Sequence, residues 1–195
     1  MPKITGPTVV EHRAAQHRAL LDAAERLIGE SGGDVPTLTE VAEAMGLARS
    51  SVYLYVKSRK DLVVQLLLDI IPNWTGGIAD AMDAAGDDPL ARLEVYVDET
   101  FRLFAKGDHG QLMVAAKQVP EAFMDPRVQE AHNALVPTLH GLLRETGGPV
   151  AVAALPILDV AAQRGAELVA SGRADEGEIR EGLRRMLRGV VSDGS

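Results

Sequence analysis

Hydrophobic residues along this chain recur every three or four positions, which is the spacing of amphipathic helices. Strand-like alternation of apolar and polar residues is brief, and no Asn-Gly hairpin signal occurs. Pairs such as Gly-Gly and Asp-Pro separate the helical stretches. We therefore expect an all-α fold of about nine helices, over residues 11–30, 37–45, a short stretch around 52, then 60–72, 88–107, 109–118, 125–144, 149–171 and 175–191.

Two of the short helical stretches flank Gly46 and form the most informative segment of the chain. The first begins at Thr37, and Glu40 three residues later completes the form of a capping box. Glycine suits the left-handed backbone that ends many helices. The second stretch has Val52 as its inward residue. This arrangement predicts a helix-turn-helix, whose second helix can enter the major groove of DNA.

The second helix and the residues after it carry many hydrogen-bond donors and no carboxylate between Arg49 and Lys60. Arg49 is the best candidate for reading a base, because arginine pairs bidentately with guanine O6 and N7. Arg59 is expected to contact phosphate, which would position the protein on every sequence alike. The candidate DNA contacts are Thr37, Thr39, Arg49, Ser50, Ser51, Tyr53, Tyr55, Lys57, Arg59 and Lys60.

This segment resembles the DNA-binding motif of the TetR family of bacterial transcriptional repressors. The matching residues are Thr37, Val41-Ala42, Gly46-Leu47, Val52-Tyr53-Leu54-Tyr55-Val56, Ser58-Arg59 and Leu62. Ala48 departs from the family's pattern, which often has a capping serine there; Val56, Arg59 and Ser50 also differ. The resemblance implies a three-helix DNA-binding domain over residues 1–58, beginning with a flexible arm at 1–10. It implies a helical ligand-binding and dimerisation domain over residues 59–195.

The charge of the 195-residue chain is unevenly distributed, with a formal net charge of −8. Residues 1–60 hold 8 lysines and arginines against 7 acidic residues, so the acidic excess lies in the remainder. DNA would attract the first part and repel the second, which favours one docking orientation. The chain has no cysteine, which excludes disulfides and zinc-thiolate sites.

The N-terminus lacks a long apolar run, and no segment is expected to be long enough to span a membrane. We therefore expect a cytoplasmic protein without a membrane partner.

The family resemblance implies a pocket for a small-molecule effector in the second domain. The effector is expected to be apolar and neutral or cationic, because basic residues are lacking along the apolar faces. Each candidate is individually more typical of ordinary core or surface. The candidate pocket residues are Trp74, Tyr96, Phe101, Phe104, His109, Met113, Phe123, Met124 and His140.

The last two helical stretches are candidates for a dimer interface. Small residues on the first permit close packing, and the second carries one apolar stripe. In the family, these helices form a four-helix bundle with their copies in a second subunit. The alternative is that the stripes pack only within the chain. The candidate interface residues are Ala154, Leu158, Ala162, Gly165, Ile179, Leu183, Met186, Leu187 and Val190.

Catalytic patterns are missing from the sequence. The five histidines are not at metal-ligand spacing, and there is no P-loop, dinucleotide fingerprint or nucleophile elbow. We therefore expect no enzyme, metal or cofactor. The expected function is a ligand-responsive repressor that binds a palindromic operator as a dimer and is released by its effector. A helical sensor or adaptor that binds protein is the alternative, and an all-helical hydrolase is a distant third.

Overall fold

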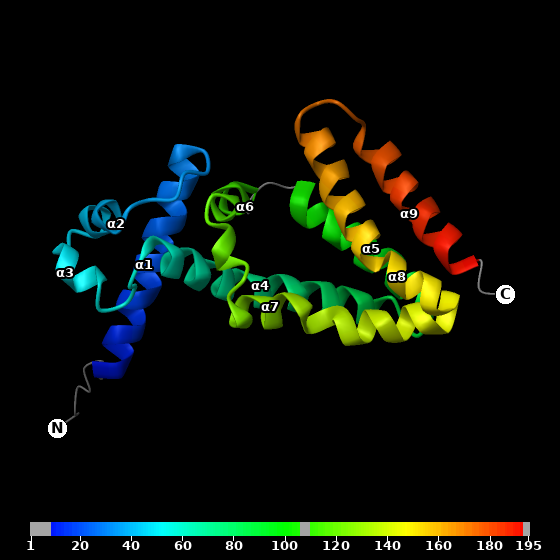
Figure 1. The fold of residues 1–195 in the computed structure, drawn as a ribbon, viewed down its shortest axis with the longest axis horizontal. Coiled ribbons are helices and arrows are strands. Elements are labelled where there is room, and N and C mark those ends of the chain that lie inside the picture. Colours follow the sequence, from blue (N-terminus) through cyan, green and yellow to red (C-terminus); the bar gives the residue numbers. More distant parts are fainter. Residues whose placement is uncertain (1–8, 106–109, 193–195) are drawn as a thin grey trace, which may run out of the picture. The chain divides into compact units, whose positions relative to one another are not determined.

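The computed structural model describes residues 9–105 and 110–192, and every regular element within them is helical (Figure 1). This confirms the all-α prediction. The expected arm falls mainly on residues outside this description, as does His109. The chain divides into two compact units, which we call the head unit (residues 1–69 and 111–128) and the body unit (residues 70–110 and 129–195). The predicted domain boundary after residue 58 stays a prediction.

The head unit contains α1 (Val9–Ser31), α2 (Leu38–Ala44), α3 (Arg49–Val52), the start of α4 (Arg59–Ala84), most of α6 (Gly110–Lys117) and the short 3-10 turn η1 (Pro120–Ala122). The predicted capping box is present, because Thr37 Oγ1 accepts from Glu40 N and Thr37 N donates to Glu40 Oε2. Gly46 has the predicted left-handed backbone, with φ of 65°. Leu20, Val41, Val52 and Leu62 are completely buried.

Helix α6 packs on the end of α1 within the head unit. Gln118 Nε2 donates to Gly33 O at 2.9 Å. Gly33 has a φ of 114°, and a Cβ atom placed on it would lie only 2.7 Å from Val114 Cγ1. Glycine at position 33 therefore permits both the turn after α1 and the close approach of α6.

Helix α4 continues to Ala84 and passes through Pro72, where the sequence predicted its end. A proline inside a helix costs about 3 kcal/mol or more, because one backbone hydrogen bond is lost and the ring crowds the previous turn. Ile70, Ile71, Ile78 and Met82 on both sides of Pro72 are buried. Burial of this continued apolar stripe offsets the cost of the proline.

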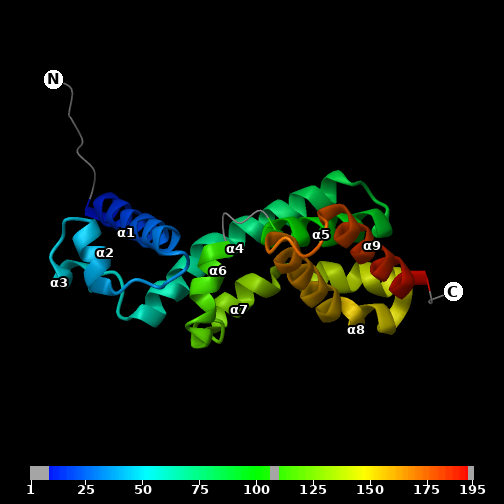
Figure 2. The same ribbon diagram turned by 90° about the horizontal axis from the view of Figure 1, so that it is seen from above.

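The body unit contains α5 (Pro89–Ala105), most of α7 (Pro126–His132), the 3-10 turn η2 (Asn133–Leu135), α8 (Val136–Ala170) and α9 (Glu176–Ser192). Figures 1 and 2 show α5, α8 and α9 lying side by side. The helix predicted over 125–144 breaks at η2, just before Pro137, where the sequence predicted a kink. Helix α8 is interrupted at Gly148, whose φ of 64° and ψ of −156° are not helical.

Two glycines allow α8 and α9 to approach closely. A Cβ atom on Gly165 would lie 2.5 Å from Ile179 Cγ2, and one on Gly147 would lie 2.8 Å from the Cα of Val191. The close packing predicted for this stretch is therefore present, but its partner is α9 of the same chain.

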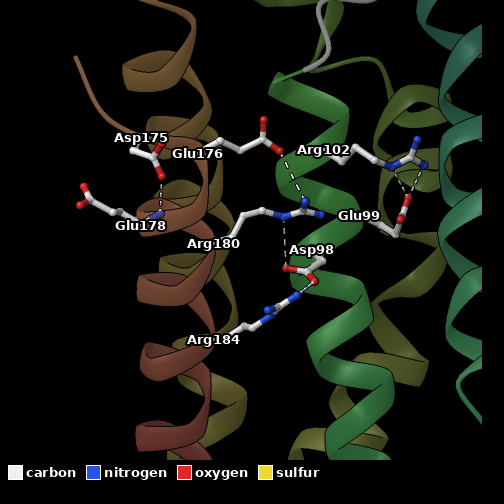
Figure 3. A network of polar contacts seen from close by, with 8 residues as sticks. All are labelled: Asp98, Glu99, Arg102, Asp175, Glu176, Glu178, Arg180 and Arg184. Atoms are coloured by element: carbon white, nitrogen blue, oxygen red, sulfur yellow. Dashed lines mark hydrogen bonds and ion pairs between the residues drawn. The ribbon is translucent and has the colours of Figure 1, made fainter. Parts of the chain in front are cut away.

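Ion pairs join α5 to α9 along the body unit. Arg180 and Arg184 of α9 both point to Asp98 of α5 (Figure 3), with Arg180 Nε at 3.8 Å from Asp98 Oδ1. Arg188 Nε pairs with Glu94 Oε1 at 2.7 Å. The Asp98 side chain is only 18% exposed, so solvent screens its ion pairs less than it screens a surface pair.

Two described helices are long and apolar enough to cross a membrane by length and composition alone: Arg59–Ala84 and the stretch Pro126–Ala170. The expectation that no segment reaches this length was wrong. The same signal is given by core helices of soluble proteins, and both stretches contain proline and contribute side chains to the buried core.

Candidate nucleic-acid interface

The second helix of the helix-turn-helix, α3, is a short helix of four residues, Arg49–Val52. Its N-cap, Ala48, provides no side-chain hydrogen bond, which confirms the missing cap seen in the sequence. Instead Val52 is completely buried and anchors the helix to the head unit. Arg49 and Ser50 are exposed, so their donors are available to a nucleic acid.

Arg49 is already engaged in the absence of DNA. Its Nη2 donates to Tyr53 Oη at 2.8 Å, and its guanidinium lies 5.4 Å from the centre of the Tyr53 ring. A cation over an aromatic ring at an exposed site contributes about 0.5–1 kcal/mol. Tyr53 thereby uses one of the five N–H donors of Arg49 and leaves the others available to a base.

Tyr55 is held between α1 and α4. The His17 ring stacks on the Tyr55 ring with centroids 6.2 Å apart and an interplanar angle of 9°. The Arg13 guanidinium lies 6.0 Å from the same ring. On the other side, Gln65 Nε2 of α4 donates to Tyr55 O at 3.0 Å. The backbone that follows α3 is thereby fixed by side chains from two other helices.

Gln65 connects this tyrosine to the start of α4. Its Nε2 also donates to Asp61 Oδ2 at 3.2 Å, and Asp61 Oδ2 accepts from Lys57 N at 2.8 Å. Since Gln65 Nε2 is the donor in both bonds, its Oε1 accepts the hydrogen bond from His17 Nε2, at 2.5 Å.

The sequence did not predict that His17 and Gln65 hold Tyr55 in place, because these two residues are 48 positions apart and His17 fits the pattern of a solvated helix face. The signal that could have drawn attention to His17 is its position on the same helix as Arg13, one turn further along.

Arg59 has a different environment from the one expected. Its Nη2 donates to Val35 O at 2.8 Å, so the guanidinium braces the loop before α2. Loss of Arg59 would affect the fold of the head unit as well as any phosphate contact.

The remaining candidate DNA contacts differ in exposure. Thr37, Tyr53, Lys57 and Lys60 are exposed, whereas Thr39, Ser51 and Tyr55 are half-buried. The half-buried Tyr55 is better suited to positioning α3 than to direct contact. Direct contacts to DNA stay a prediction for all of these residues.

The structure divides the candidate pocket residues between the two units. Met113, Phe123 and Met124 belong to the head unit, and Trp74, Tyr96, Phe101, Phe104 and His140 belong to the body unit. Met124 is 69% exposed, so the expectation that it points inward was wrong. Val119 and Ala122, at and just before the 3-10 turn η1, are buried instead.

Tyr96 and Phe101 lie in the core of the body unit. Tyr96 Oη donates to Asp159 Oδ1 at 2.5 Å. Burial raises the pKa of the Tyr96 hydroxyl, and the neighbouring Asp159 carboxylate raises it further. Burial also raises the pKa of Asp159, while the bond from Tyr96 and the charge of His132 act in the opposite direction.

Several predicted dimer residues pack inside the body unit. Leu158, Ala162, Gly165, Leu183 and Leu187 are buried there against α5, α8 and α9. Ala154, Ile179 and Val190 are half-buried, and Met186 is exposed. The inward stripe read from the sequence therefore faces mostly the chain's own core, and an interface with a second copy stays a prediction.

Helix α2 with its capping box, the turn at Gly46 and the exposed, donor-rich α3 together form a helix-turn-helix, which is a DNA-binding motif. Residues 20–66 match the sequence model described as bacterial regulatory proteins of the tetR family. This match covers the helix-turn-helix segment, so this part of the chain is similar to the TetR family of transcriptional regulators, and the fold agrees with that similarity. The alternative of a protein-binding adaptor is thereby disfavoured.

Curated proteins and solved structures of transcriptional regulators are similar to this chain in sequence or in fold. The fatty acid metabolism regulator protein of Bacillus subtilis (strain 168) is 21% identical over 138 residues, 70% of each chain. The structure of FadR from Bacillus subtilis in complex with stearoyl-CoA matches with a TM-score of 0.67 and 17% identity, over 91% of this chain and 98% of that one. The LfrR structure from Mycobacterium smegmatis in complex with proflavine matches with a TM-score of 0.61 and 20% identity, over 92% and 98%.

Proposed function

We propose that this regulator binds a palindromic operator as a homodimer, represses transcription there, and leaves the DNA when a small molecule binds the body unit. The observation that supports this most is the exposed Arg49 on α3, with the following backbone held by His17 and Gln65 through Tyr55. A preorganised donor surface of this kind suits groove recognition.

A second copy would cover an apolar surface that α8 and α9 leave exposed. Val150, Ile157 and Val160 of α8 are each more than 60% exposed, and Met186 of α9 is 45% exposed. Positions 150, 157 and 160 share one side of a helix by their spacing. Burial of these side chains against their copies would stabilise a dimer, with two heads for the two halves of a palindrome.

The relatives are transcriptional regulators, and we extend their role to this chain: a cytoplasmic sensor rather than an enzyme. FadR is described with stearoyl-CoA and LfrR with proflavine, so related folds hold chemically different molecules. The effector of this chain would be a small molecule with an apolar part, bound among the aromatic and aliphatic side chains of the body unit.

The test is selection of duplex DNA from a random pool by the purified protein, followed by binding measurements across a salt series. We expect a palindrome to be enriched, with log affinity falling linearly against log salt at about −0.9 per phosphate neutralised. Enrichment of no duplex at low salt would refute the proposal.

The matched variants are Arg49→Ala and Arg26→Ala. Both remove one exposed arginine, but Arg26 lies near the C-terminal end of α1, outside α2 and α3, and pairs with Glu30. Arg49→Ala should relax the preference at one base position, by about 1–3 kcal/mol, whereas Arg26→Ala should leave the preference unchanged. An equal, sequence-independent loss in both variants would show that Arg49 does not read a base.

A further inference from the structure

Asp159 is an acidic residue in an otherwise apolar stretch of α8, with the sequence ALPILDVAA over residues 154–162. It faces α5, because its carboxyl accepts a hydrogen bond from Tyr96. The neighbouring Leu155, Leu158 and Ala162 are buried in the core of the body unit. Asp159 itself is half-buried, so a small molecule can reach its carboxyl group from solvent.

The partner of Asp159 differs from the partners of other carboxylates in the body unit. Asp98 pairs with Arg180 and Arg184, Glu94 pairs with Arg188, and Asp83 pairs with Arg92. Within the described residues, Asp159 has no such ion pair: the hydroxyl of Tyr96 donates to it, and the charge of His132 acts on it without forming an ion pair. A carboxylate can accept about four hydrogen bonds, so most of its capacity is unused.

The helix that carries Tyr96 also carries a buried polar group with unused hydrogen-bonding capacity, the hydroxyl of Thr100. Thr100 lies one turn after Tyr96 on α5 and is 8% exposed. Its Oγ1 is close enough to the Tyr96 hydroxyl to influence the pKa of Tyr96, yet it has no hydrogen bond of ordinary geometry. Unused hydrogen-bonding groups inside a core cost free energy unless a ligand pairs with them.

We propose that Asp159, with Tyr96 hydrogen-bonded to it and Thr100 one helical turn from Tyr96, binds the positively charged amine of an otherwise apolar effector. This inference rests on the proposed function, since it names the chemical class of the molecule that releases the operator. An ammonium group supplies three N–H donors and a charge opposite to that of the carboxylate.

The same geometry disfavours anionic effectors. A carboxylate or phosphate beside Asp159 would place two negative charges in a medium of low dielectric constant, which is strongly unfavourable. The chain is therefore expected to differ from FadR, which is described with stearoyl-CoA. Specificity would come from one side chain rather than from the shape of the apolar surroundings.

The experiment uses three probes that share one alkyl chain and differ only in the head group: decylamine, decanol and decanoate. Binding to the purified full chain is measured by titration calorimetry at neutral pH, where the amine is protonated. Release of labelled operator DNA is measured in parallel by fluorescence anisotropy. We expect decylamine to bind at least 10-fold more tightly than decanol, and decanoate to bind most weakly.

The decisive variant is Asp159→Asn, which keeps the size of the side chain and removes its charge. It should weaken decylamine binding about 10- to 100-fold and leave decanol within a few-fold, because a hydrogen bond to a charged group is being lost. The matched control is Glu167→Gln on the same helix, an exposed carboxylate that pairs with Arg164. It should leave all three affinities unchanged. Tyr96→Phe keeps the carboxylate and should retain the preference for the amine.

The outcomes separate this inference from the proposed function. If decylamine binds through Asp159 but does not release the operator, the amine site stands and the effector-release part of the proposed function fails. If decanoate or decanol binds as tightly as decylamine, if Asp159→Asn keeps the amine affinity, or if no probe binds, the amine site is refuted. Operator binding in the absence of probes would be unaffected by any of these results.

Discussion

Replacement of Gly33 by alanine tests the packing of α6 on α1 within the head unit. The new Cβ atom would lie 2.7 Å from Val114 Cγ1, 3.0 Å from Val114 Cβ and 3.3 Å from Gln111 O. The backbone φ of 114° adds strain of about 1–3 kcal/mol for a residue with a side chain. Crowding adds about 1–3 kcal/mol. Val114 is 49% exposed and can partly move aside, so we expect a total loss of about 2–4 kcal/mol.

The control for this variant is Gly32→Ala. Gly32 also has a positive φ, 76°, but a Cβ atom there would meet nothing within 4 Å. Its cost should be limited to the left-handed backbone, about 1–2 kcal/mol. A double variant, Gly33→Ala with Val114→Ala, should recover the part of the loss that comes from crowding.

The assay is urea unfolding followed by circular dichroism, with the midpoints and slopes compared across the four proteins. We expect the midpoint to fall in the order wild type, Gly32→Ala, Gly33→Ala, with the double variant above the single Gly33→Ala. Equal midpoints for Gly32→Ala and Gly33→Ala would refute the close approach of α6. No recovery in the double variant would show that Val114 is not the crowded neighbour.

Three further predictions concern the body unit. Gly147→Ala should destabilise it by about 1–3 kcal/mol in urea unfolding, because the backbone of α9 at Val191 must move. The control is Gly141→Ala on the same helix, which should be neutral or slightly stabilising because a Cβ atom there would meet nothing within 4 Å. Asp98→Asn should cost about 1–3 kcal/mol by leaving Arg180 and Arg184 without their shared carboxylate. The control Glu181→Gln, which breaks an exposed pair with Arg185, should leave stability nearly unchanged, and equal losses would contradict the bridging role of Asp98. The raised pKa of Asp159 means that the folded state favours its protonated form, so wild-type stability should fall, relative to Asp159→Asn, as the pH rises above the ordinary value of 3.8. Thermal unfolding of both proteins from pH 3.5 to 7 measures this difference, and a wild-type stability that stays level or rises relative to Asp159→Asn with increasing pH would contradict the burial of the carboxyl group.

The sequence predicted the helix-turn-helix well because its signals are local. The capping box joins residues three apart, and Gly46 ends α2 through its own backbone conformation. Periodicity likewise located most helices, since it depends only on which residues of one helix face the core. These features need no knowledge of what lies on the other side of the core.

Features that depend on partners distant in the chain could not be predicted in this way. Helix α4 continues through Pro72 because buried side chains beyond it outweigh a local rule. The stripe of α9 could face its own chain or a copy, and periodicity does not distinguish the two. Asp159 was overlooked for the same reason, although a lone carboxylate in an apolar helix is a signal that can be searched for in a sequence.

If Arg49 reads a base as proposed, its pairing with Tyr53 would give the protein two modes of contact with DNA. On random sequence, phosphate contacts from residues such as Lys57 and Lys60 would hold the protein while Arg49 stays folded back on the tyrosine. A correctly placed guanine would offer the guanidinium two hydrogen bonds in place of its contact with Tyr53. The protein would then slide along random sequence with few base contacts, and its lifetime on the operator would depend in part on the return of Arg49 to Tyr53.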